Sequence, residues 1–169
     1  MDEAFKQITI TATAPSKTFN LAGLQQSNIF IPNEDIRNRF VTQYEISGLD
    51  EPNIFGIAAS QAAYSKGDEW YLAMKNYVWE NIKFADDFVN NELKGVTMNK
   101  PEGTYLIWLD FNKTGLDVNE IDNLIINKAK LWLDSGKIFG KAGEGFQRIN
   151  VTCPRIVLEE ALDRIKKAF

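Results

Sequence analysis

The stretch Ala14-Pro15-Ser16-Lys17-Thr18-Phe19-Asn20 places a lysine where an extended segment gives way to a turn. The preceding run Gln7-Ile8-Thr9-Ile10-Thr11-Ala12-Thr13 alternates in polarity, which predicts a strand over residues 7–13. The proline and the small residues around the lysine predict an amine that is partly shielded from water at the end of a sheet. Desolvation disfavours the ammonium form, and the neutral amine is the form that reacts with carbonyl groups. Taken by itself, the stretch also fits an ordinary solvated lysine at a strand end.

Further motifs follow this lysine along the chain. They are Pro101-Glu102-Gly103-Thr104-Tyr105-Leu106-Ile107-Trp108-Leu109-Asp110, Phe139-Gly140, Gly145-Phe146-Gln147-Arg148-Ile149-Asn150 and Cys153-Pro154-Arg155. In this order and spacing they resemble the MalY/PatB group of cystathionine β-lyases and C–S lyases, which are pyridoxal 5'-phosphate (PLP) enzymes with the aspartate-aminotransferase fold. The resemblance runs from about Thr9 to the end of the chain. Members of this family are much longer, and their first half precedes the lysine, so the chain is expected to be the C-terminal part of such an enzyme.

The resemblance implies roles for particular residues. Lys17 is expected to bind PLP covalently and, once released, to remove the α-proton of the substrate. Ser16 is expected to contact the cofactor phosphate. Arg148 is expected to bind the α-carboxylate of an amino-acid substrate, because a guanidinium matches a carboxylate with two parallel hydrogen bonds. Arg155, beyond Pro154, is expected to be an exposed residue at the start of a helix.

The resemblance also implies what this sequence lacks. In the family, an aspartate that pairs with the cofactor ring nitrogen and an aromatic ring that stacks on the cofactor come from upstream of the lysine. Related aminotransferases place an arginine shortly after the lysine to bind phosphate, whereas Gln25 and Gln26 stand in that neighbourhood here. The chain alone is therefore expected to be inactive.

The expected function of the parent protein is a PLP-dependent C–S β-lyase that acts on cystathionine or cysteine conjugates. An aminotransferase on the same scaffold is the main alternative, since both would use Lys17 and Arg148. A non-catalytic association or regulatory module is a third possibility. The two N-terminal strands would belong to a larger sheet, which predicts a homodimer or a strand-exchanged oligomer.

The amino-acid composition limits the classes of function that the sequence supports. Hydrophobic residues make up 44% of the 169 residues and charged residues 25%, as in ordinary globular proteins. A net charge of −4 gives no support for nucleic-acid binding, and no apolar run is long enough for a membrane span. Cys153 is the only cysteine, which suits a reducing cytoplasm. The absence of histidine excludes Ser-His-Asp catalysis and histidine metal sites within this sequence.

The expected fold class is α/β, the C-terminal part of a PLP-dependent transferase-like fold that ends in a small α+β domain. Residues 1–50 would be the tail of the large PLP-binding domain, 51–94 connecting helices and 95–169 the small domain. Tyr105 and Trp108 are expected in the core, and 95–103 as a turn region. Strands are expected at 7–13, 27–31, 104–111 and 146–152, with a short one at Trp132, and helices at 34–45, 53–65, 69–93, 117–130 and after Pro154.

Overall fold

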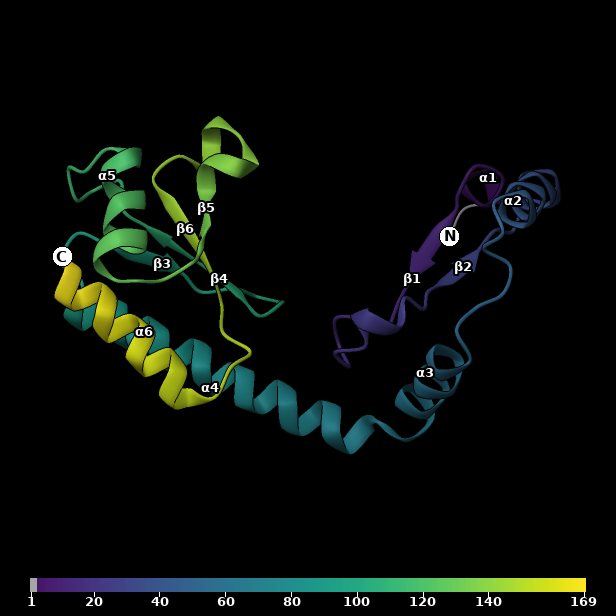
Figure 1. Cartoon of the computed structure of the whole chain (residues 1–169), viewed down its shortest axis with the longest axis horizontal. Coiled ribbons are helices and arrows are strands. Elements are labelled where there is room, and N and C mark those ends of the chain that lie inside the picture. The colour runs from purple at the N-terminus through teal and green to yellow at the C-terminus, as the bar shows by residue number, and fades with distance from the viewer. Residues whose placement is uncertain (1–2) are drawn as a thin grey trace. The chain divides into compact units, whose positions relative to one another are not determined.

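The computed structural model describes residues 3–169 of the chain. The chain divides into two compact units, one through Ala73 and one from Met74 to Phe169. The division falls inside the longest helix, α4 (Asp68–Glu92). Figure 1 labels the helices and strands of both units.

The first unit is built from short elements. They are α1 (Glu3–Lys6), β1 (Thr11–Thr13), the 3₁₀ turn η1 (Ala22–Leu24), β2 (Asn28–Phe30), α2 (Glu34–Ile46) and α3 (Ile54–Lys66). Strands β1 and β2 pair antiparallel, with Ala12 opposite Ile29. The strand expected over residues 7–13 is therefore too long, because a short helix and a turn occupy residues 3–8.

Asparagine caps begin both longer helices of the first unit. The Asn33 side chain accepts a hydrogen bond from the Ile36 amide, and its Nδ2 donates to the backbone oxygen of Gln7. Asn53 accepts from the Phe55 amide at the start of α3. An asparagine oxygen at this position satisfies a helix amide that has no intrahelical partner. The helices expected at 34–45 and 53–65 are confirmed.

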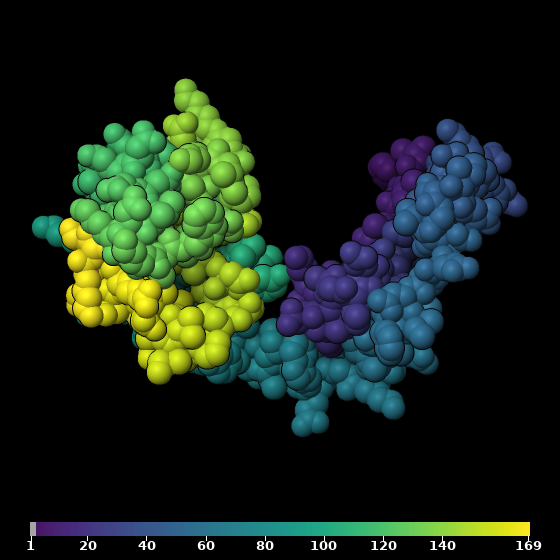
Figure 2. All heavy atoms as spheres, viewed as in Figure 1, coloured from purple at the N-terminus to yellow at the C-terminus, as the bar shows by residue number. Residues whose placement is uncertain are grey.

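The first unit has little interior. Among its described residues, Pro15, Ile31, Gly56 and Ser60 are buried. Many large apolar side chains are exposed instead: Phe5, Ile8, Ile10, Ile29, Phe30, Val41, Tyr44, Ile46, Leu49, Ile54, Phe55, Ile57, Tyr64, Trp70 and Leu72. The atoms of this unit carry the purple to blue colours of Figure 2.

The second unit is a four-stranded antiparallel sheet packed on helices. The strand order is β3 (Thr97–Asn99), β4 (Leu106–Asp110), β6 (Phe146–Asn150) and β5 (Asp134–Ser135). Between the strands lie α5 (Val118–Asn123), the π-helical turn η2 (Leu124–Lys128) and the 3₁₀ turns η3 (Gly136–Phe139) and η4 (Lys141–Gly143). The chain closes with α6 (Arg155–Ala168), which runs along α4 in Figure 1.

One face of this sheet forms the hydrophobic core. Ile107 and Leu109 of β4 and Ile149 of β6 are buried against α4, η2 and α6. Strand residues alternate between the two faces, so Trp108 and Arg148, which lie between these positions, face the other side. The site described below is built on this second face.

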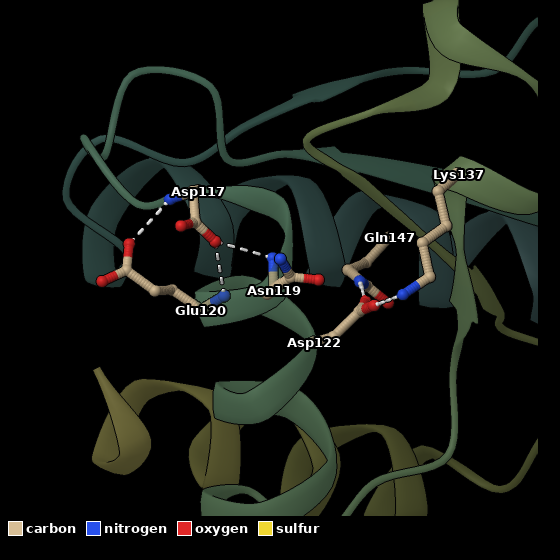
Figure 3. A network of polar contacts seen from close by, with 6 residues as sticks. All are labelled: Asp117, Asn119, Glu120, Asp122, Lys137 and Gln147. Atoms are coloured by element: carbon tan, nitrogen blue, oxygen red, sulfur yellow. Dashed lines mark hydrogen bonds and ion pairs between the residues drawn. The ribbon is translucent and has the colours of Figure 1, made fainter.

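Several expectations for the second unit are confirmed and others are wrong. Asp117 and Glu120 form the predicted capping box, which Figure 3 shows. The helix expected over 117–130 is α-helical only to Asn123 and then widens into the π-helical turn. The supposed turn region 95–103 contains β3. Trp132 lies outside any strand with 89% of its surface exposed, and the short strand is β5 instead.

Two further features concern function. No helix within residues 3–169 is long and apolar enough to cross a membrane. Within the same residues, no group of three or more histidine, cysteine, aspartate or glutamate side chains could hold a metal ion.

Candidate functional site

Lys17 lies on a hydrogen-bonded turn that follows β1. The amide of Phe19 donates to the oxygen of Pro15 at 2.9 Å, and the amide of Leu21 donates to the oxygen of Ser16 at 3.0 Å. Asn20 adopts a left-handed conformation with φ of 55°, which asparagine tolerates better than most residues. Local hydrogen bonds therefore hold the backbone from Pro15 to Leu21 in this turn.

Phe19 anchors this turn to the helices of the first unit. Its ring stacks on Trp70 at 5.8 Å between centroids and meets Tyr64 edge-on at 6.1 Å. Gly67 leaves room for the ring, because a Cβ there would lie 2.6 Å from Phe19 Cε1. Aromatic contacts of this kind contribute stability in addition to that expected from the apolar area that they bury.

The structure corrects the expected environment of Lys17. Pro15 is fully buried and Ser16 is half-buried, but Lys17 itself is exposed. The expectation of a partly shielded amine is wrong for this chain, because the residues that fix the turn lie on either side of the lysine. Ser16 and Lys17 are adjacent on the same turn, as the sequence implied.

Arg148 belongs to the second unit and lies at the centre of a cluster on the open face of the sheet. Asp134 Oδ2 accepts hydrogen bonds from Arg148 Nε at 3.1 Å and from Nη2 at 2.7 Å. The guanidinium carbon lies 4.6 Å from the centre of the Phe139 ring. We call Arg148, Asp134, Phe139 and Trp108 the arginine cluster.

The sheet register explains why this cluster forms. Asp134 on β5 and Trp108 on β4 both pair with Arg148 on β6, so the three side chains form a row across the sheet. The Trp108 ring meets Phe139 edge-on at 5.2 Å and Phe146 at 6.2 Å. Trp108 therefore lies outside the core cluster, contrary to expectation, whereas Tyr105 packs against the core.

A second polar network supports the arginine cluster from the core side. Gln147, next to Arg148, is buried and donates to Asp122 Oδ1 at 2.9 Å, and Lys137 forms an ion pair with the same carboxylate. Figure 3 shows both side chains directed at Asp122. Burial raises the pKa of Asp122, but hydrogen bonds from Lys137, Ser135 and Gln147 outweigh it and hold this pKa below its usual value. The network ties turn η3, which carries Phe139, to α5.

Arg155 is the first residue of α6, as expected, but it is not an exposed one. It is half-buried, with its guanidinium 4.5 Å from the Phe84 ring centre. Its Nε donates to Oδ1 of the buried Asn81 at 2.9 Å. Asn81 also donates to the backbone oxygens of Val151 and Cys153, so it fixes the connection from β6 to α6. This contact could not be predicted from the sequence, because Asn81 stands 74 residues from Arg155.

Cys153 is a half-buried side chain beside the core. It packs against the hydrophobic cluster, and burial raises the pKa of its thiol. A raised pKa favours the protonated thiol over the reactive thiolate.

The residues near Lys17 fit a covalently bound aldehyde cofactor with a phosphate group. A primary amine stands accessible on a hydrogen-bonded turn, and the neighbouring serine supplies a hydroxyl that can donate to phosphate oxygens. Arg148, in the other unit, carries a guanidinium, a group whose geometry matches a carboxylate. The chemistry of the donor set therefore agrees with the resemblance found in the sequence.

Comparisons with known proteins point the same way, although no family model matches the chain. The chain is 42% identical over all its 169 residues to the cystathionine β-lyase PatB of Bacillus subtilis. It is 30% identical over 151 residues, 89% of its length, to the protein MalY of Escherichia coli. It spans 44% of the length of PatB and 39% of that of MalY.

Solved structures match with high similarity. Cystalysin from Treponema denticola, which contains PLP, superposes with a TM-score of 0.93 at 37% identity and covers 99% of the chain. A PLP-bound putative aminotransferase from Clostridium difficile superposes with a TM-score of 0.94 at 40% identity, also over 99% of the chain. The chain covers 42% and 43% of these structures, respectively. The chain is homologous to the C-terminal part of PatB- and MalY-type cystathionine β-lyases and has the corresponding part of the fold of type I PLP-dependent enzymes.

Proposed function

We propose that this chain contributes the cofactor-binding lysine and the carboxylate-binding arginine of a PLP-dependent C–S β-lyase. The observation that carries the proposal is the 42% identity to a cystathionine β-lyase over the whole chain. The chain also carries a lysine on a hydrogen-bonded turn, Lys17, and a guanidinium held by hydrogen bonds, Arg148. The substrates would be cystathionine or other cysteine conjugates, which are converted with water to a thiol, pyruvate and ammonia.

Each residue has a defined task in this proposal. Lys17 Nζ would hold PLP and then take the proton from the α-carbon of the substrate. The Ser16 hydroxyl would donate to the cofactor phosphate, and Arg148 would bind the α-carboxylate. PLP, when bound, would draw electrons away from the α-carbon, which makes loss of that proton possible. Holding the carboxylate would limit the orientations that the bound substrate can adopt.

The organisation of the parent protein is part of the proposal. Residues 1–50 would be the tail of the PLP-binding domain, residues 51–94 the connecting helices and residues 95–169 the small domain. The protein would be cytoplasmic, since a single cysteine suits a reducing compartment. It would associate as a homodimer or a strand-exchanged oligomer, supported by the apolar surface that the first unit exposes.

An aminotransferase on the same scaffold is the second candidate. The close structural match described as a putative aminotransferase supports it. The two reactions differ in their needs: a β-lyase releases pyruvate from cystathionine without a keto acid, whereas an aminotransferase requires a keto acid to accept the amino group. A non-catalytic association or regulatory module would do neither.

The test joins this chain in frame to the amino-terminal part of Bacillus subtilis PatB and measures pyruvate release from cystathionine. Lys17→Ala should abolish turnover in this fusion, because the cofactor-binding amine and the proton acceptor are the same residue. Lys66→Ala, which removes another exposed lysine of the first unit, is the matched control and should leave activity unchanged. Substantial lyase activity in the Lys17→Ala fusion would contradict the assignment, and dependence on an added keto acid would favour the aminotransferase.

A further inference from the structure

We infer that Asp134 is a positioning residue for the arginine that binds the substrate. It holds one edge of the Arg148 guanidinium and leaves the opposite edge free for the α-carboxylate of an amino acid. This inference rests on the proposed function for the identity of the carboxylate. The contact between Asp134 and Arg148 is a property of the chain itself.

The hydrogen-bond pattern defines which edge is held. Asp134 Oδ2 accepts from both Nε and Nη2 of Arg148, so the side of the guanidinium nearest its stem is occupied. A guanidinium carries five N–H groups in one plane. One N–H of Nη1 and the second N–H of Nη2 form the edge directed away from Asp134, and this pair matches a carboxylate with two parallel bonds.

Two features restrict the rotation of the guanidinium. Asp134 and Arg148 are direct cross-strand partners, so the carboxylate is fixed to the sheet and not to a free loop. The Phe139 ring lies against the guanidinium face at 4.6 Å. One contact fixes an edge and the other fixes the plane, which together direct the remaining edge. A lysine at position 148 would offer no such edge.

The charge of Asp134 distinguishes a role in positioning Arg148 from a role in attracting the substrate carboxylate. A carboxylate beside Arg148 partly cancels its positive charge and repels an incoming carboxylate, so Asp134 does not strengthen binding through its charge. An asparagine at this position keeps an oxygen that can accept from Nε and Nη2 but carries no charge. Positioning therefore predicts that Asp134→Asn retains substrate binding and that Asp134→Ala weakens it.

The pair is partly shielded, which sets the size of the expected effect. The Arg148 side chain keeps 26% of its surface exposed and the Asp134 side chain 48%. Pairs at such sites contribute modestly because water screens them, so removal of the acceptor should change measured rates or constants about two- to fivefold. Asp163, with 46% of its side chain exposed and paired with Lys167, provides a matched control carboxylate.

The first measurement uses the 169-residue chain without cofactor. Phenylglyoxal, which modifies arginine, is added, and the rate of modification at Arg148 is followed by peptide mass spectrometry. Asp134→Ala should increase this rate about two- to fivefold, whereas Asp134→Asn and Asp163→Ala should leave it near that of the unmodified sequence. Arg164 provides an internal reference in every sample, and circular dichroism checks that each variant is folded. Equal rates at Arg148 in the original chain and in Asp134→Ala would overturn the inference.

The second measurement uses the fusion with the Bacillus subtilis amino-terminal part. Asp134→Ala should raise KM for cystathionine about two- to fivefold with little change in kcat, and Asp134→Asn should restore KM. A purely structural role would instead lower the amount of folded protein and leave KM unchanged, and an unchanged KM overturns the inference. A folded fusion without lyase activity contradicts the proposed function, and the phenylglyoxal rates then decide the inference by themselves.

Discussion

Two neighbouring residues of β6 lie on opposite faces of the sheet and contact different partners. Gln147 faces the core side of β6 and bonds Asp122, whereas Arg148 faces the open side and bonds Asp134. Side chains of a strand alternate between the two faces of the sheet, and this alternation alone gives the two residues different partners. Asp122 thus stabilises, from the core side of the sheet, the turn η3 that carries Phe139.

The lowered pKa of Asp122 makes this support dependent on pH. A carboxyl group whose pKa is lower in the folded state stabilises the fold above its unfolded value of 3.8, and this contribution is lost as pH falls through the folded value. Asp122→Ala should therefore lower the free energy of unfolding by about 1–2 kcal/mol at pH 7, and by less at pH 3. Urea unfolding at both pH values measures the difference, with Asp163→Ala as the exposed control. An equal loss of stability at the two pH values would show that the charge of Asp122 is not involved.

At the scale of elements, one buried side chain joins α4, β6 and α6. Asn81 is fully buried and donates to the oxygens of Val151 and Cys153, while its own oxygen accepts from Arg155. Asn81→Ala would leave those buried carbonyl groups without their donor, which costs roughly 2–4 kcal/mol in free energy of unfolding. Asn90→Ala changes an exposed asparagine of the same helix and should shift stability by less than about 0.5 kcal/mol. Thermal unfolding compares the two, and equal effects would contradict this role for Asn81.

The sequence predicted elements well where the signal was local and poorly where it depended on pairing. Helix α2 was predictable from Asn33 and the acidic residues of its first turn, and α5 from Asp117 and Glu120. Strands β3 and β5 contain three and two residues, too few for any periodicity, and they form because β4 and β6 offer them edges. The candidates Lys17, Ser16 and Arg148 were predictable from motifs, but the contact of Asp134 with Arg148 was not, because it depends on the register between β5 and β6.

At the scale of the whole molecule, the first unit exposes more apolar surface than a stable surface should carry. Ile8, Ile10 and Phe30 are at least half exposed, and the two-stranded sheet has short strands with open edges. Contiguous apolar surface and unpaired strand edges recruit partners. The 169-residue chain should therefore self-associate through residues of the first unit. Light scattering at ~0.1 mM should detect oligomers even if association is in the micromolar range, and Ile10→Lys together with Phe30→Lys should reduce them. A monodisperse monomer at that concentration would contradict the prediction.

The exposure of Lys17 predicts that this chain alone has no meaningful lyase activity. Transition-state charges are stabilised by donors in a site that excludes water, whereas the Lys17 amine stands in solvent on its turn. PLP should then modify Lys17 only to an extent similar to other exposed lysines such as Lys66. Lys166 should react more slowly, because the hydrogen bond and the charge of Glu92 raise its pKa and hold the amine protonated. Incubation with PLP, reduction with borohydride and peptide mapping measure these extents, with pyruvate release assayed in parallel. Labelling confined to Lys17, with pyruvate formed from cystathionine, would mean that the isolated chain shields its lysine and holds a working site.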